Sequence, residues 1–326
     1  YFTQQTSIVD ALLRRERDEI QAVDCVSLQI EPNDSIAIIG ESGCGKTTLL
    51  FTLMGLHEHT GGMMRFRGRD TAGFAAADWK KFRRNVQVIF QDPFNSLDPK
   101  LSVEQTLKEP LKIHNIDEQD RRVDEMLRQV ELDPPEKYRK SLPRNLSGGE
   151  KQRVSIARAL ILEPDVILAD EPVSMLDVST QAAVLRLLND LTEERGLSML
   201  YVSHDLSTVS YICDVVNVMY LGRIVERGPT AALLDSPKHP YTQQLIKAIP
   251  VPDPHHVRDR TDLRGTPSDP TDMPSGCRFK DRCPERMDAC DERPASVAVT
   301  DSGDRVVACH LYDAAGDGTQ HGGDHE

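Results

Sequence analysis

One short stretch restricts the possible folds of this chain more than any other. Residues 35–50 read SIAIIGESGCGKTTLL, in which an apolar run ends at Gly40 and a helical pattern begins near Lys46. The spacing G-x-x-x-x-G-K-T between them is a phosphate-binding loop in the strand–loop–helix setting that it requires. Its backbone N–H groups and the start of the helix attract phosphates. We therefore expect an α/β fold in which Lys46 reaches the β- and γ-phosphates and Thr47 binds Mg²⁺.

Two further apolar runs predict the rest of the same site. Residues 165–172 read DVILADEP, and such a run is typical of a buried parallel strand. The strand would deliver Asp170 and Glu171 to the carboxyl edge of the sheet, where open α/β sheets bind ligands. There Asp170 suits Mg²⁺, and Glu171 is placed to act as a general base on water. His204 follows the run SMLYV at residues 198–202, so we expect it at this edge, near the γ-phosphate.

A second glycine-rich helix start lies in NLSGGEKQR at residues 145–153. The start of a helix binds anions, and one nucleoside triphosphate does not need two such ends from a single chain. We therefore predict a head-to-tail dimer, in which Ser147 and Gly149 of one subunit contact the γ-phosphate held by the other subunit.

Together with VIFQDP at residues 88–93 and SMLD at 174–177, these motifs resemble the ATP-binding subunits of ABC transporters, in the family's order. The resemblance implies that two ATP molecules bind between two subunits and that closure of this dimer around them moves attached membrane subunits. Hydrolysis, with Glu171 and His204 as catalytic residues, would reopen the dimer. ATP contacts would come from Gly40, Ser42, Gly43, Gly45, Lys46, Thr47, Thr48 and Gln91. Mg²⁺ would be bound by Thr47, Gln91 and Asp170, and ATP would be contacted in trans by Ser147, Gly148, Gly149 and Asp177.

The first residues of the chain are expected to complete the ATP site. The family stacks adenine on an aromatic side chain that precedes the phosphate-binding loop. Tyr1 and Phe2 match that position, and Phe2 is our assignment. Residues 7–20 look like a charged amphipathic helix with a solvated face.

Three longer stretches are similar to the oligopeptide/dipeptide importer ATPases: residues 88–103, 170–185 and 236–250. The similarity implies a RecA-like P-loop ABC nucleotide-binding domain with an antiparallel β part over residues 1–232, including a helical subdomain at about 92–155. It further implies a small cysteine-rich C-terminal extension over 233–312, and the composition of residues 313–326 predicts a disordered tail.

The same similarity predicts the partners and the location. We expect two transmembrane permease subunits, a second ATPase subunit that is a paralogue, and an external substrate-binding protein. The chain would then work at the cytoplasmic face of the cell membrane as a peripheral subunit that powers peptide import.

Four cysteines follow this cassette, at Cys277, Cys283, Cys290 and Cys309. Their C-x5-C-x6-C-x18-C spacing lacks the close pairs typical of zinc sites, whereas Cys₄ ligation of an iron–sulfur cluster tolerates irregular spacing. A segment with few large apolar residues also needs a staple in order to fold. We expect a structural [4Fe–4S] cluster, which the resemblance favours; Zn²⁺, or unliganded cysteines with or without a disulfide, are the alternatives.

Composition and the catalytic motifs each weigh against one other class of function. Lys and Arg number 39 and Asp and Glu 52, which leaves a net charge of −13; nucleic-acid binding recruits basic faces instead. The alternative function, a soluble ABC ATPase acting on nucleic acid or ribosomes, is therefore disfavoured, and no nucleic-acid partner is expected. A regulatory module without turnover is opposed by Glu171 and His204. No apolar run of about 18 residues predicts a membrane span, and because the chain opens with Tyr1 we expect its native start to be missing.

Overall fold

The structure is a computed structural model that describes residues 2–3, 19–248, 273–300 and 302–313. Tyr1, the side chain of Phe2, most of the helix expected over residues 7–20 and the tail after residue 313 lie outside the described residues. The end of that expected helix is instead strand β2 (Glu19–Ile20), which pairs antiparallel with β1 (Phe2–Thr3). The chain divides into two compact units, each described by itself.

The first, which we call the parallel-sheet unit, comprises residues 27–38 and 46–214. Its strands lie in the order β3, β8, β7, β6, and β7 runs parallel to both of its neighbours. Their bounds are β3 (Ser35–Ile39), β6 (Val86–Ile89), β7 (Val166–Asp170) and β8 (Ser198–Ser203). The strands predicted before Gly40, Asp170 and His204 are thereby confirmed. Residues 199–202 of β8 are fully buried, as expected for a strand covered on both faces.

Helices make up most of the remainder of this unit. A short hairpin of β4 (Arg65–Phe66) with β5 (Arg69–Asp70) lies in the chain between helix α2 (Lys46–Leu53) and helix α3 (Ala76–Asn85). The helices are α2 (Lys46–Leu53), α3 (Ala76–Asn85), α4 (Pro93–Ser96), α5 (Val103–Ile113), α6 (Gln119–Gln129), α7 (Pro135–Arg139), α8 (Gly148–Leu160), α9 (Val178–Arg195) and α10 (Leu206–Ile212), with single 3₁₀ turns at Thr71–Gly73 and Pro143–Asn145.

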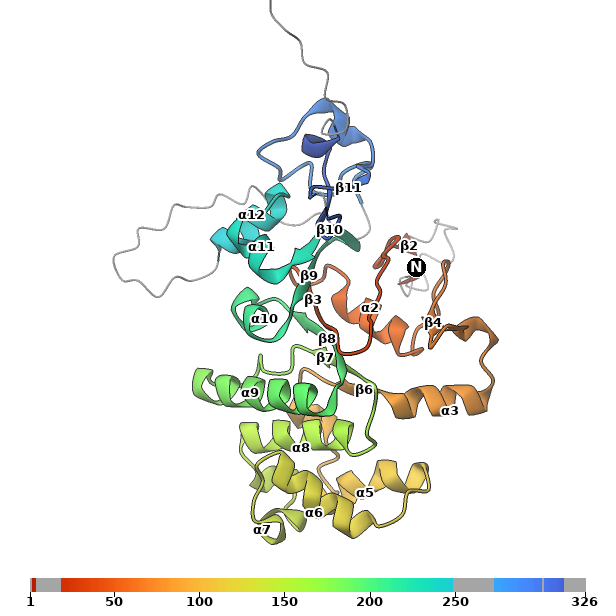
Figure 1. The fold of residues 1–326 in the computed structure, drawn as a ribbon, viewed down its shortest axis with the longest axis vertical. Coiled ribbons are helices and arrows are strands. Elements are labelled where there is room, and N and C mark those ends of the chain that lie inside the picture. Colours follow the sequence, from red (N-terminus) through yellow and green to blue (C-terminus); the bar gives the residue numbers. More distant parts are fainter. Residues whose placement is uncertain (1, 4–18, 249–272, 301, 314–326) are drawn as a thin grey trace, which may run out of the picture. The chain divides into compact units, whose positions relative to one another are not determined.

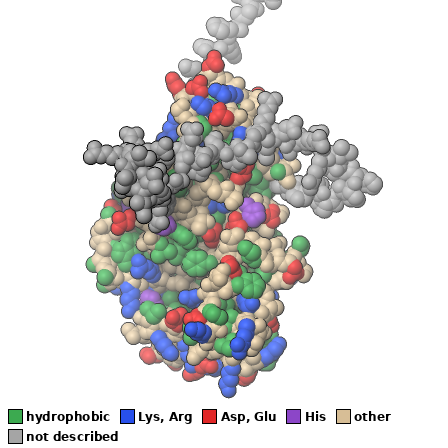
Figure 2. Space-filling view, turned by 180° about the vertical axis from the view of Figure 1, so that it is seen from behind, with side chains coloured by type: hydrophobic (Ala, Val, Ile, Leu, Met, Phe, Trp, Pro, Cys, Tyr) green, Lys and Arg blue, Asp and Glu red, His purple; other side chains and the backbone are tan. Residues whose placement is uncertain are grey.

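Within residues 92–155, where the sequence predicts helices, α5 and α6 occupy Val103–Ile113 and Gln119–Gln129. A capping box starts α5, because the Ser102 hydroxyl accepts from the Gln105 backbone N–H at 3.3 Å and the side-chain oxygen Oε1 of Gln105 accepts from the Ser102 backbone N–H at 2.8 Å. Helices α5 and α6 pack on one side of α8, and α9 packs on another (Figure 1). Acidic and basic side chains alternate on the lower surface in Figure 2, where these helices lie.

The second, which we call the antiparallel unit, comprises residues 1–26, 39–45 and 215–326. Its strands lie in the order β9 (Val215–Tyr220), β10 (Arg223–Pro229), β12 (Val306–Ala308) and β11 (Ser296–Ala298), and each pairs antiparallel with the next. Two helices follow β10, namely α11 (Thr230–Asp235) and α12 (Pro240–Lys247), and 3₁₀ turns cover Asp288–Asp291 and His310–Tyr312.

Charged side chains are buried in pairs within the antiparallel unit. Arg305 contacts Glu226 at 2.9 Å, and the Glu226 side chain is fully buried. Arg278 and Arg223 both reach one carboxylate oxygen of Asp24, each at 2.7 Å. A buried charge of this kind is tolerated only with a well-placed partner. Among the described helices of the chain, none combines the length and the apolar character that crossing a membrane requires.

Candidate functional site

The loop that leaves β3 is held in a conformation that only glycine can adopt. We call residues 40–45 the glycine loop. A Cβ on Gly40 would lie 2.1 Å from the carbonyl oxygen of Met219, and a Cβ on Gly45, whose φ is +106°, would lie 2.1 Å from that of Ala22. Real Cβ atoms do not come so close to backbone, so both positions require glycine. The N–H of Gly222 further donates to the Cys44 carbonyl at 2.7 Å.

Two side chains from the C-terminal part of the antiparallel unit contact the glycine loop at Glu41. The hydroxyl of Tyr241 accepts from the Glu41 N–H at 2.9 Å, and Arg282 binds the Glu41 carboxylate through two nitrogens at 3.0 and 3.1 Å. Neither residue stands in a motif that the sequence alone links to phosphate binding. They lie 200 and 241 positions from Glu41, and no local motif could have pointed to them.

Helix α2 begins at Lys46, directly after the glycine loop. Lys46 is buried, and the hydroxyl of Thr47 hydrogen-bonds the carboxylate of Asp170 at the end of β7. Burial raises the pKa of Asp170, while the hydrogen bond from Thr47 and the nearby charge of Lys46 lower it. A buried carboxylate beside a hydroxyl supplies the oxygen ligands that Mg²⁺ prefers, so these two residues fit the cation assigned to them.

Three neighbouring strands end in polar side chains that meet at Glu171. Gln91 follows β6, Glu171 follows β7 and His204 follows β8. The Gln91 side-chain amide donates to Oε2 of Glu171 at 3.0 Å, and Nδ1 of His204 lies 3.0 Å from the same oxygen. Parallel strands bring their carboxyl ends to one edge of the sheet, and Glu171 and His204 lie at the edge where the sequence predicts them.

The backbone holds Glu171 in an uncommon conformation. Its φ is +43°, in the left-handed region that side chains other than glycine rarely adopt. Its N–H continues the sheet ladder to the Val202 carbonyl at 2.8 Å, and its own carbonyl accepts from the Ser174 N–H at 3.2 Å and hydroxyl at 3.1 Å. Such strained residues persist where the surrounding structure over-determines them, which is common at active sites. The strain turns the carboxylate towards Gln91 and His204.

The glycine-rich start of α8 and the segment before α9 lie side by side. Ser147 caps α8, and Asp177 caps α9 by accepting from the Thr180 N–H at 3.1 Å. Hydrogen bonds from Ser179 and Thr180 lower the pKa of Asp177 to about 2. One open pocket is lined by both segments, through Ser147, Gly148, Gly149, Glu150, Arg153, Met175, Leu176, Asp177, Ser179, Thr180 and Ala183.

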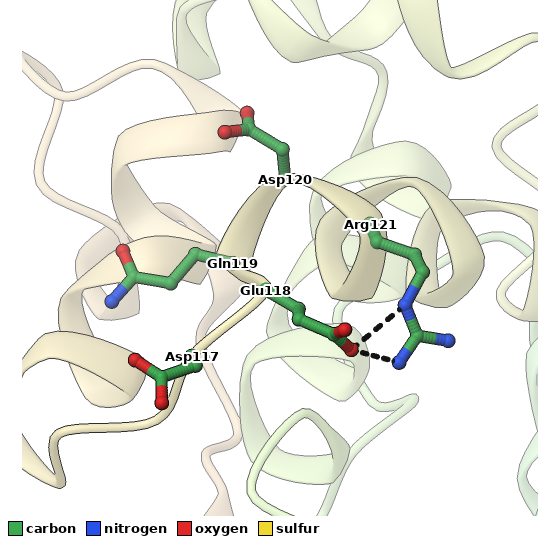
Figure 3. A pocket seen from close by; sticks show the side chains of 5 residues that line it. All are labelled: Asp117, Glu118, Gln119, Asp120 and Arg121. Atoms are coloured by element: carbon green, nitrogen blue, oxygen red, sulfur yellow. Dashed lines mark hydrogen bonds and ion pairs between the residues drawn. The ribbon is translucent and has the colours of Figure 1, made fainter.

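Another pocket lies at the start of α6 (Figure 3), formed by residues 117–121. Figure 3 shows Glu118 turned towards Arg121, which pairs with it, while Asp120 points away. Asp120 is itself paired with Lys108 at 2.8 Å. These acidic side chains are already neutralised by partners, so the pocket offers no chemistry comparable with that around Glu171.

Comparisons with known proteins agree with this geometry. The family described as ABC transporter matches residues 23–174, and the family described as oligopeptide/dipeptide transporter, C-terminal region, matches residues 225–290. The oligopeptide transport ATP-binding protein AppF of Bacillus subtilis is 41% identical over 94% of this chain and 94% of its own length. YkfD of the same organism, also named for oligopeptide transport, is 43% identical over 90% of each chain.

The chain belongs to the ATP-binding subunits of ABC transporters, in the oligopeptide/dipeptide importer family. It is therefore an ATPase with a P-loop fold and a mixed α/β sheet. A peptide ABC transporter ATP-binding protein of Sinorhizobium fredii, y4tS, is also 44% identical over 90% of this chain and 83% of its own length.

Solved structures of two ABC cassettes are similar to this ATPase. The cbiO1 protein of Clostridium perfringens, part of an ABC transporter complex, has a TM-score of 0.60 at 29% identity, over 66% of this chain and 84% of its own. The ATP-binding cassette MJ0796, in a dimeric post-hydrolysis state bound to ADP and Pi, has a TM-score of 0.57 at 31% identity, over 64% of this chain and 90% of its own.

The expected cysteine-bound metal is a wrong prediction. No group of three or more His, Cys, Asp or Glu within the described residues could hold a metal ion, and the relatives are named for peptide transport and ATP binding without mention of iron and sulfur. Burial raises the pKa of Cys277 and Cys309, and that of Cys283 to about 11. Neither a [4Fe–4S] cluster nor Zn²⁺ is supported.

The segment around these cysteines has buried residues of its own, which the sequence argument for a metal staple did not anticipate. Phe279 is 1% exposed and packs edge-on against Tyr220, with ring centroids 5.2 Å apart. Arg278 and Arg282 are buried with acidic partners, Asp24 and Glu41. Counting large apolar residues in the sequence missed this support, because the partners come from the other end of the chain.

Proposed function

We propose that this ATPase powers the import of peptides through an ABC transporter, with Glu171 as the general base. The convergence of Gln91 and His204 on one oxygen of Glu171 carries the proposal. Because carboxylates only accept hydrogen bonds, Nδ1 of His204 must carry the proton of its contact. Both donors orient the carboxylate, so that its other oxygen, Oε1, is placed to take the proton of an attacking water.

The remaining roles follow the predicted assignment. ATP phosphates are bound by the backbone of the glycine loop, with Ser42, Gly43, Lys46, Thr47 and Thr48, and Phe2 stacks on adenine. Mg²⁺ would be held by Thr47, Gln91 and Asp170, where it would neutralise phosphate charge. His204 contacts the γ-phosphate through its second ring nitrogen.

The pocket lined by Ser147, Gly148, Gly149 and Asp177 serves the ATP of a second subunit. The start of α8 supplies N–H groups to an anion, and in the structure these N–H groups open into a pocket of their own. Head-to-tail pairing would give each of two ATP molecules one glycine loop and one such helix start. The dimeric form of the similar cassette MJ0796 supports this arrangement.

We further propose the expected organisation and partners. Residues 1–232 form the nucleotide-binding domain with its helical subdomain at about 92–155, residues 233–312 form the C-terminal extension, and residues 313–326 are a tail. The subunit works at the cytoplasmic face of the membrane with two permease subunits, a paralogous ATPase and an external substrate-binding protein. The names of relatives such as AppF support peptide as the cargo.

The test replaces Glu171 by Gln, which keeps the shape and the hydrogen bond from His204 but removes the base. We expect ATP hydrolysis to fall by about 10²–10⁴-fold, with ATP binding retained. Glu163→Gln, at an exposed carboxylate outside the site, is the matched control. Unchanged hydrolysis by the Glu171 variant would refute the assignment of the base. In cells lacking the native copy, uptake of a labelled peptide should return with the wild-type chain and not with this variant.

A further inference from the structure

The contact of the C-terminal region with Glu41 is more than surface packing. Glu41 begins a turn, because its carbonyl accepts from the Cys44 N–H at 3.3 Å. Its N–H is bound by Tyr241 and its carboxylate by both terminal nitrogens of Arg282. Three groups of one residue are thus occupied at the start of the glycine loop. We call Tyr241 and Arg282 the Glu41 clamp.

The clamp is rigid and shielded from water. Tyr241 is fully buried, and the Arg282 side chain is 6% exposed. The rings of Tyr220, Tyr241 and Phe279 pack together with centroids 4.6 to 5.4 Å apart, and the guanidinium of Arg282 lies over two of them. The Tyr220 hydroxyl lies 3.2 Å from a nitrogen of Arg282. A bidentate pair between arginine and a carboxylate in such surroundings fixes the geometry of both partners.

Phosphate binding by a glycine loop depends on where its N–H groups point. The clamp takes the Glu41 N–H out of the set that can face a phosphate, and it anchors the turn from which the following N–H groups project. The glycines that allow this turn have high conformational freedom. Anchoring the turn before the ligand arrives lowers the ordering that binding would otherwise require.

We propose that Tyr241 and Arg282 are positioning residues through which the C-terminal region sets the affinity of the glycine loop for ATP. The proposal rests on the proposed function, since it takes the loop as the phosphate site. It gives the C-terminal region a role in the nucleotide site, which the region performs through side chains packed on the loop of the same compact unit.

The experiment measures the Kd of the full chain for a non-hydrolysable ATP analogue, together with kcat and KM for ATP. Arg282→Met should weaken binding about tenfold, because a charge-assisted pair is lost and Glu41 is left without it. Tyr241→Phe removes one hydroxyl and should weaken binding about threefold. KM should rise in step with Kd, while kcat at saturation changes less than twofold, because Gln91, Glu171 and His204 are untouched. Arg282→Lys keeps the charge without the fork and should restore part of the affinity.

Two matched controls separate positioning from general loss of stability. Arg305→Lys disrupts a bidentate-capable arginine that is equally buried but pairs with Glu226. Tyr312→Phe removes a hydroxyl that donates to the Lys238 carbonyl at 3.1 Å. Both should leave the Kd unchanged, and Lys46→Ala should abolish binding.

Each outcome decides one of the two ideas. Wild-type Kd values for both Arg282→Met and Tyr241→Phe, with binding lost in Lys46→Ala, would overturn the positioning role and leave the proposed function standing. A rise in Kd for the controls equal to that for the clamp variants would overturn it as well. Retained binding in Lys46→Ala would instead refute the phosphate site itself. If Arg282→Met does not fold, Tyr241→Phe and Arg282→Lys decide the question.

Discussion

At the ends of β6, β7 and β8, polar side chains converge on the carboxylate of Glu171 and leave it partly open to solvent, whereas in the antiparallel unit the carboxylate of Glu226 is enclosed with Arg305. The His204 side chain is 57% exposed and that of Glu171 15%. The side chains of Glu226 and Arg305 are 0% and 6% exposed. Glu171 and Glu226 each accept from two or more donors, yet of the two only Glu171 remains accessible to water and phosphate.

The two carboxylates serve different properties of the protein, one its turnover and the other its stability. A carboxylate that is to take a proton from water must remain accessible, and Glu171 keeps part of its side chain exposed in a strained backbone conformation. A carboxylate enclosed with its arginine holds neighbouring segments in place, because removing one partner leaves an uncompensated charge. Variants at the strand ends should therefore change turnover without changing stability, and variants of the pair formed by Glu226 and Arg305 should do the reverse.

The largest expected effect is on the buried pair. Arg305→Met leaves Glu226 in the interior without its partner, and the free energy of unfolding should fall by about 3–5 kcal/mol. Chemical denaturation measures this change. ATP turnover at a temperature where the variant is folded should stay within twofold of wild type. A stability loss below 1 kcal/mol would contradict the structural role of the pair and break the comparison.

The second prediction concerns His204, which follows β8, where turnover should change and stability should not. His204→Ala removes one of the two donors to Glu171 and the contact proposed with the γ-phosphate, so turnover should fall by about 10²-fold. Steady-state hydrolysis measures the rate, and thermal unfolding should be unchanged because the side chain is exposed. The exposed His59→Ala is the control. Turnover within twofold of wild type would remove His204 from the catalytic residues.

A smaller, pH-dependent effect is expected at His239. Burial lowers the pKa of His239 to about 3, from its usual 6.5, so below pH 6.5 the unfolded chain binds a proton that the folded chain does not. The stability that comes from keeping His239 neutral in the folded chain is complete above pH 6.5 and is lost as the pH falls towards 3. Between pH 6.5 and 5 the free energy of unfolding should fall by roughly 2 kcal/mol from this source.

The variant His239→Asn isolates this contribution. Asparagine can still accept from the Tyr241 N–H, as Nδ1 of His239 does at 3.0 Å, and so preserves the cap of α12 without titrating. Its unfolding free energy should depend less steeply on pH than that of wild type over this window. Denaturation curves at a series of pH values measure the slopes, and equal slopes would contradict the neutral, buried state of His239.

The smallest effect on stability is expected at an exposed ion pair, which serves as the reference for the buried one. Arg67 and Asp165 form an exposed ion pair, with side chains 63% and 42% exposed. Arg67→Ala should change the free energy of unfolding by less than about 1 kcal/mol, and less still at high salt. Turnover should not change. A larger loss would mean that exposed pairs matter here, and the contrast between buried and exposed carboxylates would be less sharp.

How far the sequence predicts this protein depends on the range of the interactions. The strand before Gly40 and the strands before Asp170 and His204 were predictable, because an apolar run and a polar residue that ends it are adjacent in the chain. The grouping of Gln91, Glu171 and His204 at one edge also follows, since parallel strands align their carboxyl ends. The capped starts of α5 and α8 follow from Ser102 and Ser147 with the acceptors three positions later.

The cysteines mark the limit of such reasoning. Their number and spacing suggested a metal, but burial and the ionisation of thiols depend on neighbours that are distant in sequence. Arg278 meets Asp24 across 254 positions, and Arg282 meets Glu41 across 241. Nothing in the local sequence of either arginine identifies its partner.

The sequence by itself determined the family, the phosphate-binding loop and the order of the strand ends, because these depend on residues that are close together along the chain. The orientation of Glu171, the residues that hold Glu41 and the burial of Cys277, Cys290 and Cys309 are set by the fold alone. These features depend on contacts between distant segments, and their free energies depend on burial, which a pattern of residues does not specify.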